Sequence, residues 1–148
     1  MSNFQVDVEK SQVDELFNKL DDDDLRRQIM LEGLKGGARV LTERTKELFK
    51  TRMGEAATHY SRYIKKPFYE GVRMTVDKAY NETIVSIMSD FRMRFFERGT
   101  KDRTTKKGYG RGHLTAKHFF RDARNSSENE IYDAMNKDIN KAFTKYIG

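Results

Sequence analysis

Three features follow one another over residues 91–123, FRMRFFERGTKDRTTKKGYGRGHLTAKHFFRDA. They are an alternating apolar and basic segment, a basic loop with glycines, and a turn with two phenylalanines. The rest of the chain is read from this stretch outward. Apolar and basic side chains alternate at its start, namely Phe91, Met93 and Phe95 against Arg92 and Arg94. This period of two predicts a strand over 91–97 with one buried and one basic face. Gly99 tolerates a positive φ, so we expect a sharp turn where the strand ends.

The loop over 100–115 lies in the most positively charged part of the chain. Eight lysines and arginines lie between Phe91 and Arg111 against two acids, a local net charge of +6 that equals the net charge of the whole 148-residue chain. Such charge permits contact with nucleic acid or with acidic protein surfaces, without deciding between them. The candidate contact residues are Arg98, Lys101, Arg103, Lys106, Lys107 and Arg111.

Helical periodicity governs the first third of the chain. Residues 1–10 read as a frayed end or an edge strand, and 11–20 as a short amphipathic helix. The four acids over 21–24 suit a helix N-terminus better than a cation loop, which needs glycine and spaced acids. A long helix is expected over 23–52, with the apolar stripe Met30, Leu34, Ala38, Leu41 and Leu48, flanked by Ile29, Val40 and Phe49. The pair Gly36-Gly37 inside it predicts a kink, a close backbone approach or a break, and we favour one continuous or kinked helix.

The rest of the chain predicts a small sheet followed by a last helix. Residues 52–66 read as a flexible connector that ends at Pro67, and the loop over 100–115 is expected to be flexible as well. Strands over 72–76 and 83–88 would join 91–97 in an antiparallel meander, although a helix over 68–80 is the alternative. Asn81, which tolerates a left-handed backbone, would turn the chain between the first two strands, and Ser89-Asp90 would turn it before the third. A helical turn is expected over 117–124. A capping box, Ser127 to Glu130, opens a helix with the stripe Ile131, Met135, Ile139, Ala142, Phe143 and Tyr146. We therefore expect an α+β fold in one domain, 1–148, with long N-terminal helices and a C-terminal helix packed on a sheet of three to four strands.

The composition argues against an enzyme and against a membrane protein. The chain has no cysteine and three histidines, so thiolate metal sites are excluded and zinc chemistry is poorly supplied. His113 and His118 are five residues apart, which does not place them on one helix face; a metal site of both with Glu97, or a nuclease using His118, is a remote alternative. No phosphate-binding glycine motif, no apolar run long enough to cross a bilayer and no signal-peptide core is present. We expect no cofactor and no membrane contact.

A family resemblance is carried by the end of the predicted strand and by the segment after the loop. The pattern is an aromatic residue before Glu-x-Gly-Thr, then a variable loop, then Ala-x-x-Phe-Phe-x-x-Ala before a C-terminal helix. Its positions here are Phe96, Glu97, Gly99 and Thr100, followed by Ala116, Phe119, Phe120 and Ala123. In this layout the chain resembles the siphophage tail-component family of tailed phages and prophages. His118 and Asp122 stand where the family often has proline, and its Pro-x-x-Thr-Gly-x-Leu segment is missing.

The resemblance implies a non-enzymatic virion protein, made in the bacterial host cytoplasm, that acts in head-tail joining or tail completion. Such proteins assemble with copies of themselves, here expected as a six-fold ring, and with neighbouring neck or tail proteins. Glu97, Gly99 and Thr100 would shape the loop exit, and Phe119 and Phe120 would hold its return. We expect Phe95 and one of Phe119 and Phe120 in the core, with Phe96 exposed. The alternative is a basic nucleic-acid-binding accessory protein that uses loop 100–112.

Overall fold

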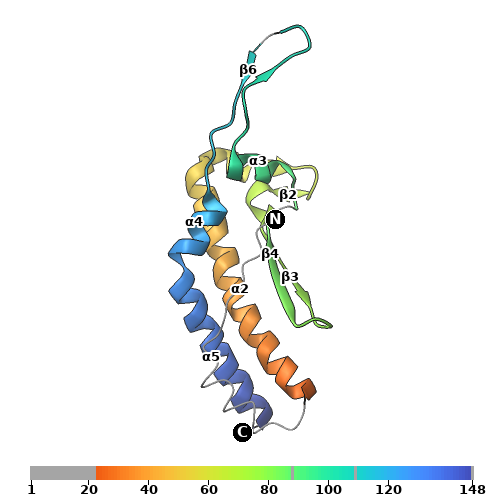
Figure 1. Cartoon of the computed structure of the whole chain (residues 1–148), viewed down its shortest axis with the longest axis vertical. Helices are drawn as coiled ribbons and strands as arrows, with labels where there is room; N and C mark the ends of the chain where they lie inside the picture. The colour runs from red at the N-terminus through yellow and green to blue at the C-terminus, as the bar shows by residue number, and fades with distance from the viewer. Residues whose placement is uncertain (1–22, 88, 109, 148) are drawn as a thin grey trace. The chain divides into compact units, whose positions relative to one another are not determined.

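The computed structural model describes residues 23–87, 89–108 and 110–147 (Figure 1). The helix expected over 11–20 lies outside these ranges, as does the start of the acidic run. The elements follow in the order α2 (Asp23–Met53), η1 (Gly54–Thr58), β1 (Tyr60–Ser61), β2 (Lys66–Pro67), η2 (Phe68–Gly71), β3 (Arg73–Asp77), β4 (Glu82–Ser86), α3 (Arg92–Arg98), β5 (Arg103–Thr104), β6 (Gly110–Gly112), α4 (Phe119–Ser126) and α5 (Glu128–Ile147). The predicted α+β class is confirmed.

The chain divides into two compact units. Unit 1 comprises residues 1–43, 74–85 and 126–148, and unit 2 comprises 44–73 and 86–125. Helix α2 contributes its first part to unit 1 and its last part to unit 2. Each unit is described by itself below.

Unit 1 is built on the packing of α2 against α5 (Figure 1). The predicted Gly36-Gly37 pair lies inside a continuous helix, and a Cβ at Gly37 would lie 2.7 Å from Met135 Cγ and 3.1 Å from Ile131 Cγ2. Of the three interpretations of this pair, the structure therefore supports the close approach of a second helix. The buried residues of α5 follow the predicted stripe, at Ile131, Met135, Ile139 and Ala142, while Tyr146 is exposed.

The predicted stripe of α2 was partly wrong. Ala38 and Leu41 are buried, but Met30, Leu34 and Leu48 are only half-buried. The buried positions also include Ile29, Leu31, Thr45 and Phe49. Ile29 and Phe49 had been expected beside the stripe. The stripe itself was drawn off-centre because the part of the helix that faces α5 carries glycines, which a count of large apolar residues leaves out.

Unit 2 encloses an aromatic core. Phe49 of α2 lies at its centre, with ring centroids 4.8 Å from Phe119, 5.8 Å from Phe68 and 6.5 Å from Phe96. Phe119 and Phe120 are both buried, and Phe96 is half-buried against the rings of Phe49 and Phe68. The predictions that Phe96 is exposed and that only one of Phe119 and Phe120 is buried were therefore wrong. The prediction that Phe95 lies in the core was also wrong, because Phe95 is only half-buried.

The predicted strand over 91–97 was also wrong, because these residues form the helix α3. The carboxylate of Asp90 accepts the backbone N–H of Arg92 at 3.1 Å and so supports the first turn of the helix. Met93 and Glu97 are the buried residues, and their spacing of four is helical. With apolar residues at 91, 93, 95 and 96, so short a segment fits both periods, and the hydrogen bond to Asp90 favours the helix.

The strands of the described residues form three two-stranded sheets rather than one meander. β3 and β4 match two of the predicted strands, and Asn81 in their connection adopts the expected left-handed conformation, with φ 51°. β1 pairs with β2, with Tyr60 opposite Pro67, inside the stretch that was expected to be a plain connector. The helix predicted to start near 117 begins at Phe119, and α5 begins at Glu128, directly after the predicted cap Ser127.

Candidate interaction site: the basic arm and its base

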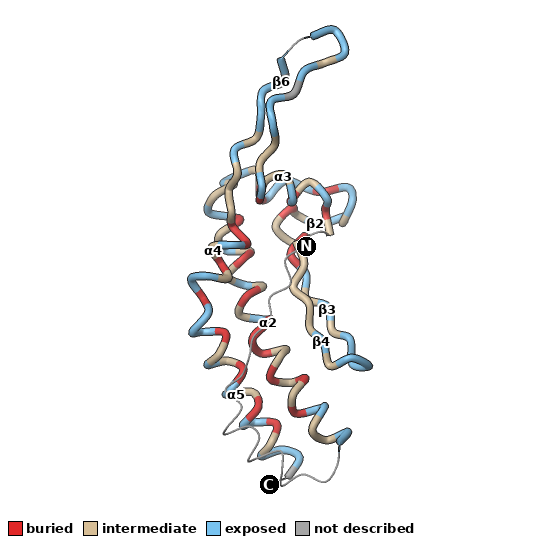
Figure 2. The backbone as a smooth tube through the Cα atoms, in the orientation of Figure 1, coloured by how far each residue is buried: buried red, intermediate tan, exposed pale blue. Residues whose placement is uncertain are grey.

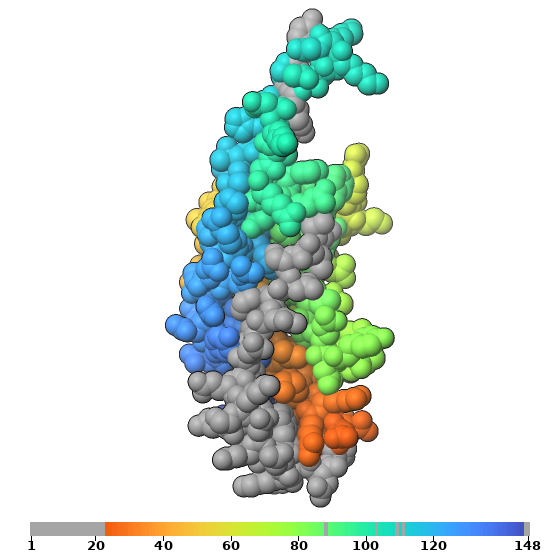
Figure 3. All heavy atoms as spheres, viewed as in Figure 1, coloured from red at the N-terminus to blue at the C-terminus, as the bar shows by residue number. Residues whose placement is uncertain are grey.

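Residues 100–115 form an arm within unit 2. β5 and β6 pair antiparallel, with Arg103 opposite Gly112 and Thr104 opposite Gly110, and the register shifts between them. Gly108, with φ 83°, closes the turn by donating its N–H to the carbonyl of Thr105 at 2.9 Å. Most described arm residues are exposed (Figure 2), and Figure 3 shows the arm as a narrow protrusion. The loop predicted over 100–115 is thus a short paired arm.

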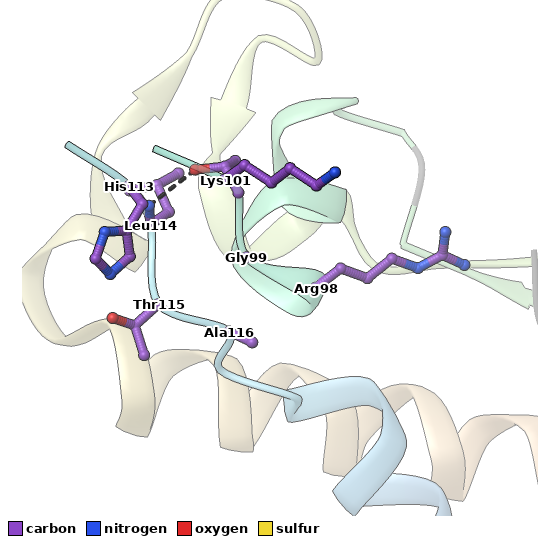
Figure 4. Close-up of a pocket in the computed structure, with 8 residues that line it drawn as sticks. Arg98, Gly99, Lys101, His113, Leu114, Thr115 and Ala116 are labelled. Carbon is purple, nitrogen blue, oxygen red and sulfur yellow. Dashed lines mark hydrogen bonds between the residues drawn. The ribbon is translucent and has the colours of Figure 1, made fainter. Parts of the chain in front are cut away.

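The base of the arm is held by Gly99 and Thr100. Gly99 has φ 74°, and a Cβ there would lie 2.8 Å from the carbonyl oxygen of Leu114 and 2.9 Å from the nitrogen of Ala116. Thr100 donates its N–H to the Leu114 carbonyl at 3.0 Å, and Leu114 donates its own N–H to Thr100 Oγ1 at 2.8 Å (Figure 4). Only glycine fits at position 99, since both the backbone angle and the space exclude a side chain.

Glu97 ties the outgoing chain to the returning chain. Its buried carboxylate accepts the backbone N–H groups of Phe120, at 2.8 Å, and Arg121, at 3.1 Å, in the first turn of α4. Its carbonyl accepts the N–H of His118 at 3.1 Å. A carboxylate that caps orphan N–H groups and faces the positive end of a helix is stabilising. Glu97 therefore positions α4 on α3.

Helix α4 is fixed to α2 by aromatic packing and by one ion pair. Arg52 of α2 donates from the same nitrogen to the carbonyl of Lys117 and to Asp122 Oδ2, each at 2.6 Å. The Arg52 hydrogen bond, with a smaller effect from Arg121, lowers the pKa of Asp122 below its usual value. Sequence reasoning missed Arg52 and Asp122, since 70 residues separate them. No local pattern signals such a pair.

His118, at a position where the predicted resemblance expects proline, has a left-handed backbone. It has φ 47°, a value that is uncommon for non-glycine residues, although histidine adopts it more often than most. Proline, which the family often carries here, is locked near −65° and has no N–H. The return of the arm in this chain therefore follows a path that the proline cannot take.

The positive charge of the site is carried by exposed side chains. Arg98 and Lys101 extend to the same side of the arm base, away from His113 and Thr115 (Figure 4). A shallow pocket of about 530 Å³ lies among these residues. Lys106 and Lys107 are exposed near the arm tip, and none of these four cations forms an ion pair with another described residue. Arg103 and Arg111 are placed by their backbone in β5 and β6.

In the described part of the chain no three His, Cys, Asp or Glu side chains come close enough to hold a metal ion. His113 is bound instead to Asp102, with Nδ1 2.7 Å from Oδ1, and both side chains are exposed. The predicted residues Phe96, Glu97, Gly99, Thr100, Phe119, Phe120 and Ala123 come together around the arm base and its return.

Comparison of the chain with protein-family models, with curated proteins and with solved structures finds no match. Within the described residues, no helix is long and apolar enough to cross a bilayer. The resemblance to the tail-component family therefore stays a prediction.

Proposed function

We propose that the protein is a structural virion component of a tailed phage or prophage, acting in head-tail joining or tail completion. The observation that carries this proposal is the convergence of the residues of the resemblance. Glu97, Gly99 and Thr100 shape the start of the arm, while Phe119 and Phe120 fasten its return. The residues before the arm and those after it are 19 or more positions apart in sequence. Together they form a fixed base from which the exposed arm extends.

In this proposal the arm reaches a neighbouring copy or a neighbouring neck or tail protein. A head-to-tail contact of this kind closes a ring when its rotation divides a full turn, and the proposed ring is six-fold. The exposed cations Lys101, Lys106 and Lys107 favour an acidic partner surface. The protein is made in the host cytoplasm and ends in the virion.

The test is electron microscopy of lysates from a phage or prophage that lacks this gene, complemented with plasmid copies. The deletion should leave full heads beside separate tails, or tails of abnormal length. Gly99→Val should fail to complement, because the side chain meets the Leu114 carbonyl and the Ala116 nitrogen. Gln28→Val, at an exposed position of α2 outside the arm, is the control and should complement the deletion. Intact infectious particles from the deletion strain would overturn the proposal.

A second candidate is a nucleic-acid-binding accessory protein that uses loop 100–112. The distribution of charge between the units favours it. Unit 2 contains 19 lysines and arginines against 7 aspartates and glutamates, a net charge of +12, whereas unit 1 contains 10 against 16, a net charge of −6. Affinity carried by such a unit should fall steeply with salt, as counterions are released from the phosphates. Binding that does not change with salt concentration would remove this candidate.

A further inference from the structure

A second exposed feature of unit 2 lies outside the arm. Tyr63, in the turn between β1 and β2, and Phe91, just before α3, are 51% and 47% exposed. Their ring centroids lie 5.1 Å apart in an edge-to-face pair, and the ring of Phe95 lies 6.2 Å from that of Phe91. We call Tyr63, Phe91 and Phe95, with Arg62 and Arg94, the aromatic patch.

The patch is held in place from beneath by a buried carboxylate. Asp90 has no exposed surface and accepts hydrogen bonds from Ser61 Oγ and from the guanidinium of Arg92, at 2.9 Å from Nε and 2.6 Å from the second nitrogen. The Arg92 guanidinium lies 5.0 Å from the Tyr63 ring centre and 4.6 Å from that of Phe68. The two exposed rings are therefore already ordered before a ligand arrives. Stacking a ligand on them costs little further side-chain conformational entropy.

Exposed cations surround these rings. Arg62 lies 5.5 Å from the Tyr63 ring centre and Arg94 5.4 Å from that of Phe95, and both are exposed. Lys65 and Lys66 follow in the same turn and are also exposed. None of the four forms an ion pair with another described residue. Arg92, in contrast, is neutralised by Asp90.

Exposed rings among exposed cations, on a unit of net charge +12, suit a ligand that carries both aromatic faces and regular negative charge. Single-stranded nucleic acid has both, since its bases stack on aromatic side chains while its phosphates bind lysine and arginine. An acidic protein segment would use the cations but leave the rings exposed. We propose that the aromatic patch is a base-stacking site for single-stranded nucleic acid. This inference does not rest on the head-tail function proposed above.

The test compares binding of two labelled strands, an oligothymidylate and an abasic strand of equal length, by fluorescence anisotropy. The full-length chain should bind the oligothymidylate more tightly. Tyr63→Ala and Phe91→Ala should each weaken oligothymidylate binding by about tenfold, because one stacked base contributes on the order of 1–3 kcal/mol. Both variants should leave binding of the abasic strand unchanged, since phosphate contacts do not need the rings.

Three controls separate stacking from other effects. Tyr63→Phe keeps the ring and should retain affinity, which would show that the ring and not the hydroxyl carries the binding. Tyr80→Ala removes the most exposed large apolar side chain of the described residues, which lies in acidic unit 1. It should leave the affinity for both nucleic-acid strands unchanged. The double variant Lys106→Ala, Lys107→Ala alters the arm alone. It should weaken the binding of the oligothymidylate and of the abasic strand by the same factor.

Absence of binding by the wild-type chain would overturn the proposal. So would equal affinities of Tyr63→Ala and wild type for oligothymidylate. Sedimentation velocity of the same variants adds a further arm: a change in self-association with unchanged nucleic-acid binding would assign the patch to a protein interface instead. A failure of this kind leaves the head-tail proposal standing, because that proposal is tested by the particles and not by the patch.

Discussion

At the scale of single residues, two carboxylates organise unit 2 by accepting hydrogen bonds at the starts of helices. Glu97 accepts the N–H groups of Phe120 and Arg121 in α4, and Asp90 accepts that of Arg92 in α3. Both carboxylates are buried, so leaving their partners unpaired would be costly. The sequence marked Glu97 through the resemblance, but read Asp90 only as part of a turn.

Replacing Glu97 with glutamine should lower the free energy of unfolding by about 1–2 kcal/mol. The amide offers one oxygen to two N–H donors and removes the negative charge from the N-terminus of α4. Urea denaturation checks this value. Glu55→Gln, at an exposed position in η1, is the control and should stay within about 0.5 kcal/mol of wild type. Equal stability of the two variants would show that Glu97 does not cap α4.

The stability of unit 2 should depend on pH through Asp90. Hydrogen bonds from the Arg92 side chain lower the pKa of Asp90 to about 2, against the opposing effect of burial and with a smaller contribution from Ser61. Because the pKa is depressed on folding from 3.8, the stabilisation is present above about pH 4 and is lost as the pH falls towards 2. A shift of this size corresponds to about 2 kcal/mol.

This pH dependence is measured as the difference in unfolding free energy between wild type and Asp90→Asn. The difference should shrink between about pH 5 and pH 2, since Asp90 takes up a proton there in the unfolded chain, with its usual pKa of 3.8, while the folded state holds the carboxylate ionised to about pH 2. The amide of the variant does not titrate. A difference that stays constant over this range would contradict the assignment of the low pKa to Asp90.

At the scale of elements, glycine decides how closely α2 approaches α5 in unit 1. Gly33, Gly36 and Gly37 all lie within van der Waals reach of α5, and all three are buried. Glycine inside a helix costs about 1 kcal/mol relative to alanine, so this interface offsets a loss of intrinsic helix stability by packing. The pattern of glycines, and not a stripe of leucines, marks the contact.

Gly37→Leu should therefore destabilise the protein although leucine is the better helix former. The side chain would overlap Met135 and Ile131, and overpacking typically costs about 1–3 kcal/mol, which exceeds the gain in helix propensity. Thermal unfolding by circular dichroism measures the change. Gln28→Leu, at an exposed position of the same helix, should not lower the melting temperature. A stabilised Gly37→Leu variant would rule out the close packing.

At the scale of the whole molecule, fold stability and the proposed contacts are carried by different residues. The described side chains near the arm tip, such as Lys106 and Lys107, are exposed, whereas the arm base is tied by Glu97, Gly99 and Thr100. Exposed residues contribute little to the free energy of unfolding. The arm is thus separable from the fold that presents it.

Replacing residues 103–112 with an Asn-Gly turn should leave the free energy of unfolding within about 0.5 kcal/mol of wild type. The same variant should fail to complement the deletion strain, because the proposed partner contact is lost. Urea denaturation and electron microscopy provide the two measurements. Normal particles from the arm-less variant would show that the arm is not the assembly contact, and strong destabilisation would show that it belongs to the core.

The sequence alone determined the features that depend on neighbours along the chain. The periodicity of α2 and α5, the start of α5 after Ser127, the left-handed Asn81 and the need for glycine at 99 all follow from local backbone chemistry. The tertiary structure decided the rest. Residues 92–98 form a helix, Phe119 and Phe120 are both buried, and Arg52 pairs with Asp122. These outcomes depend on partners that are distant in sequence. A period of two or four in a short segment does not encode such partners.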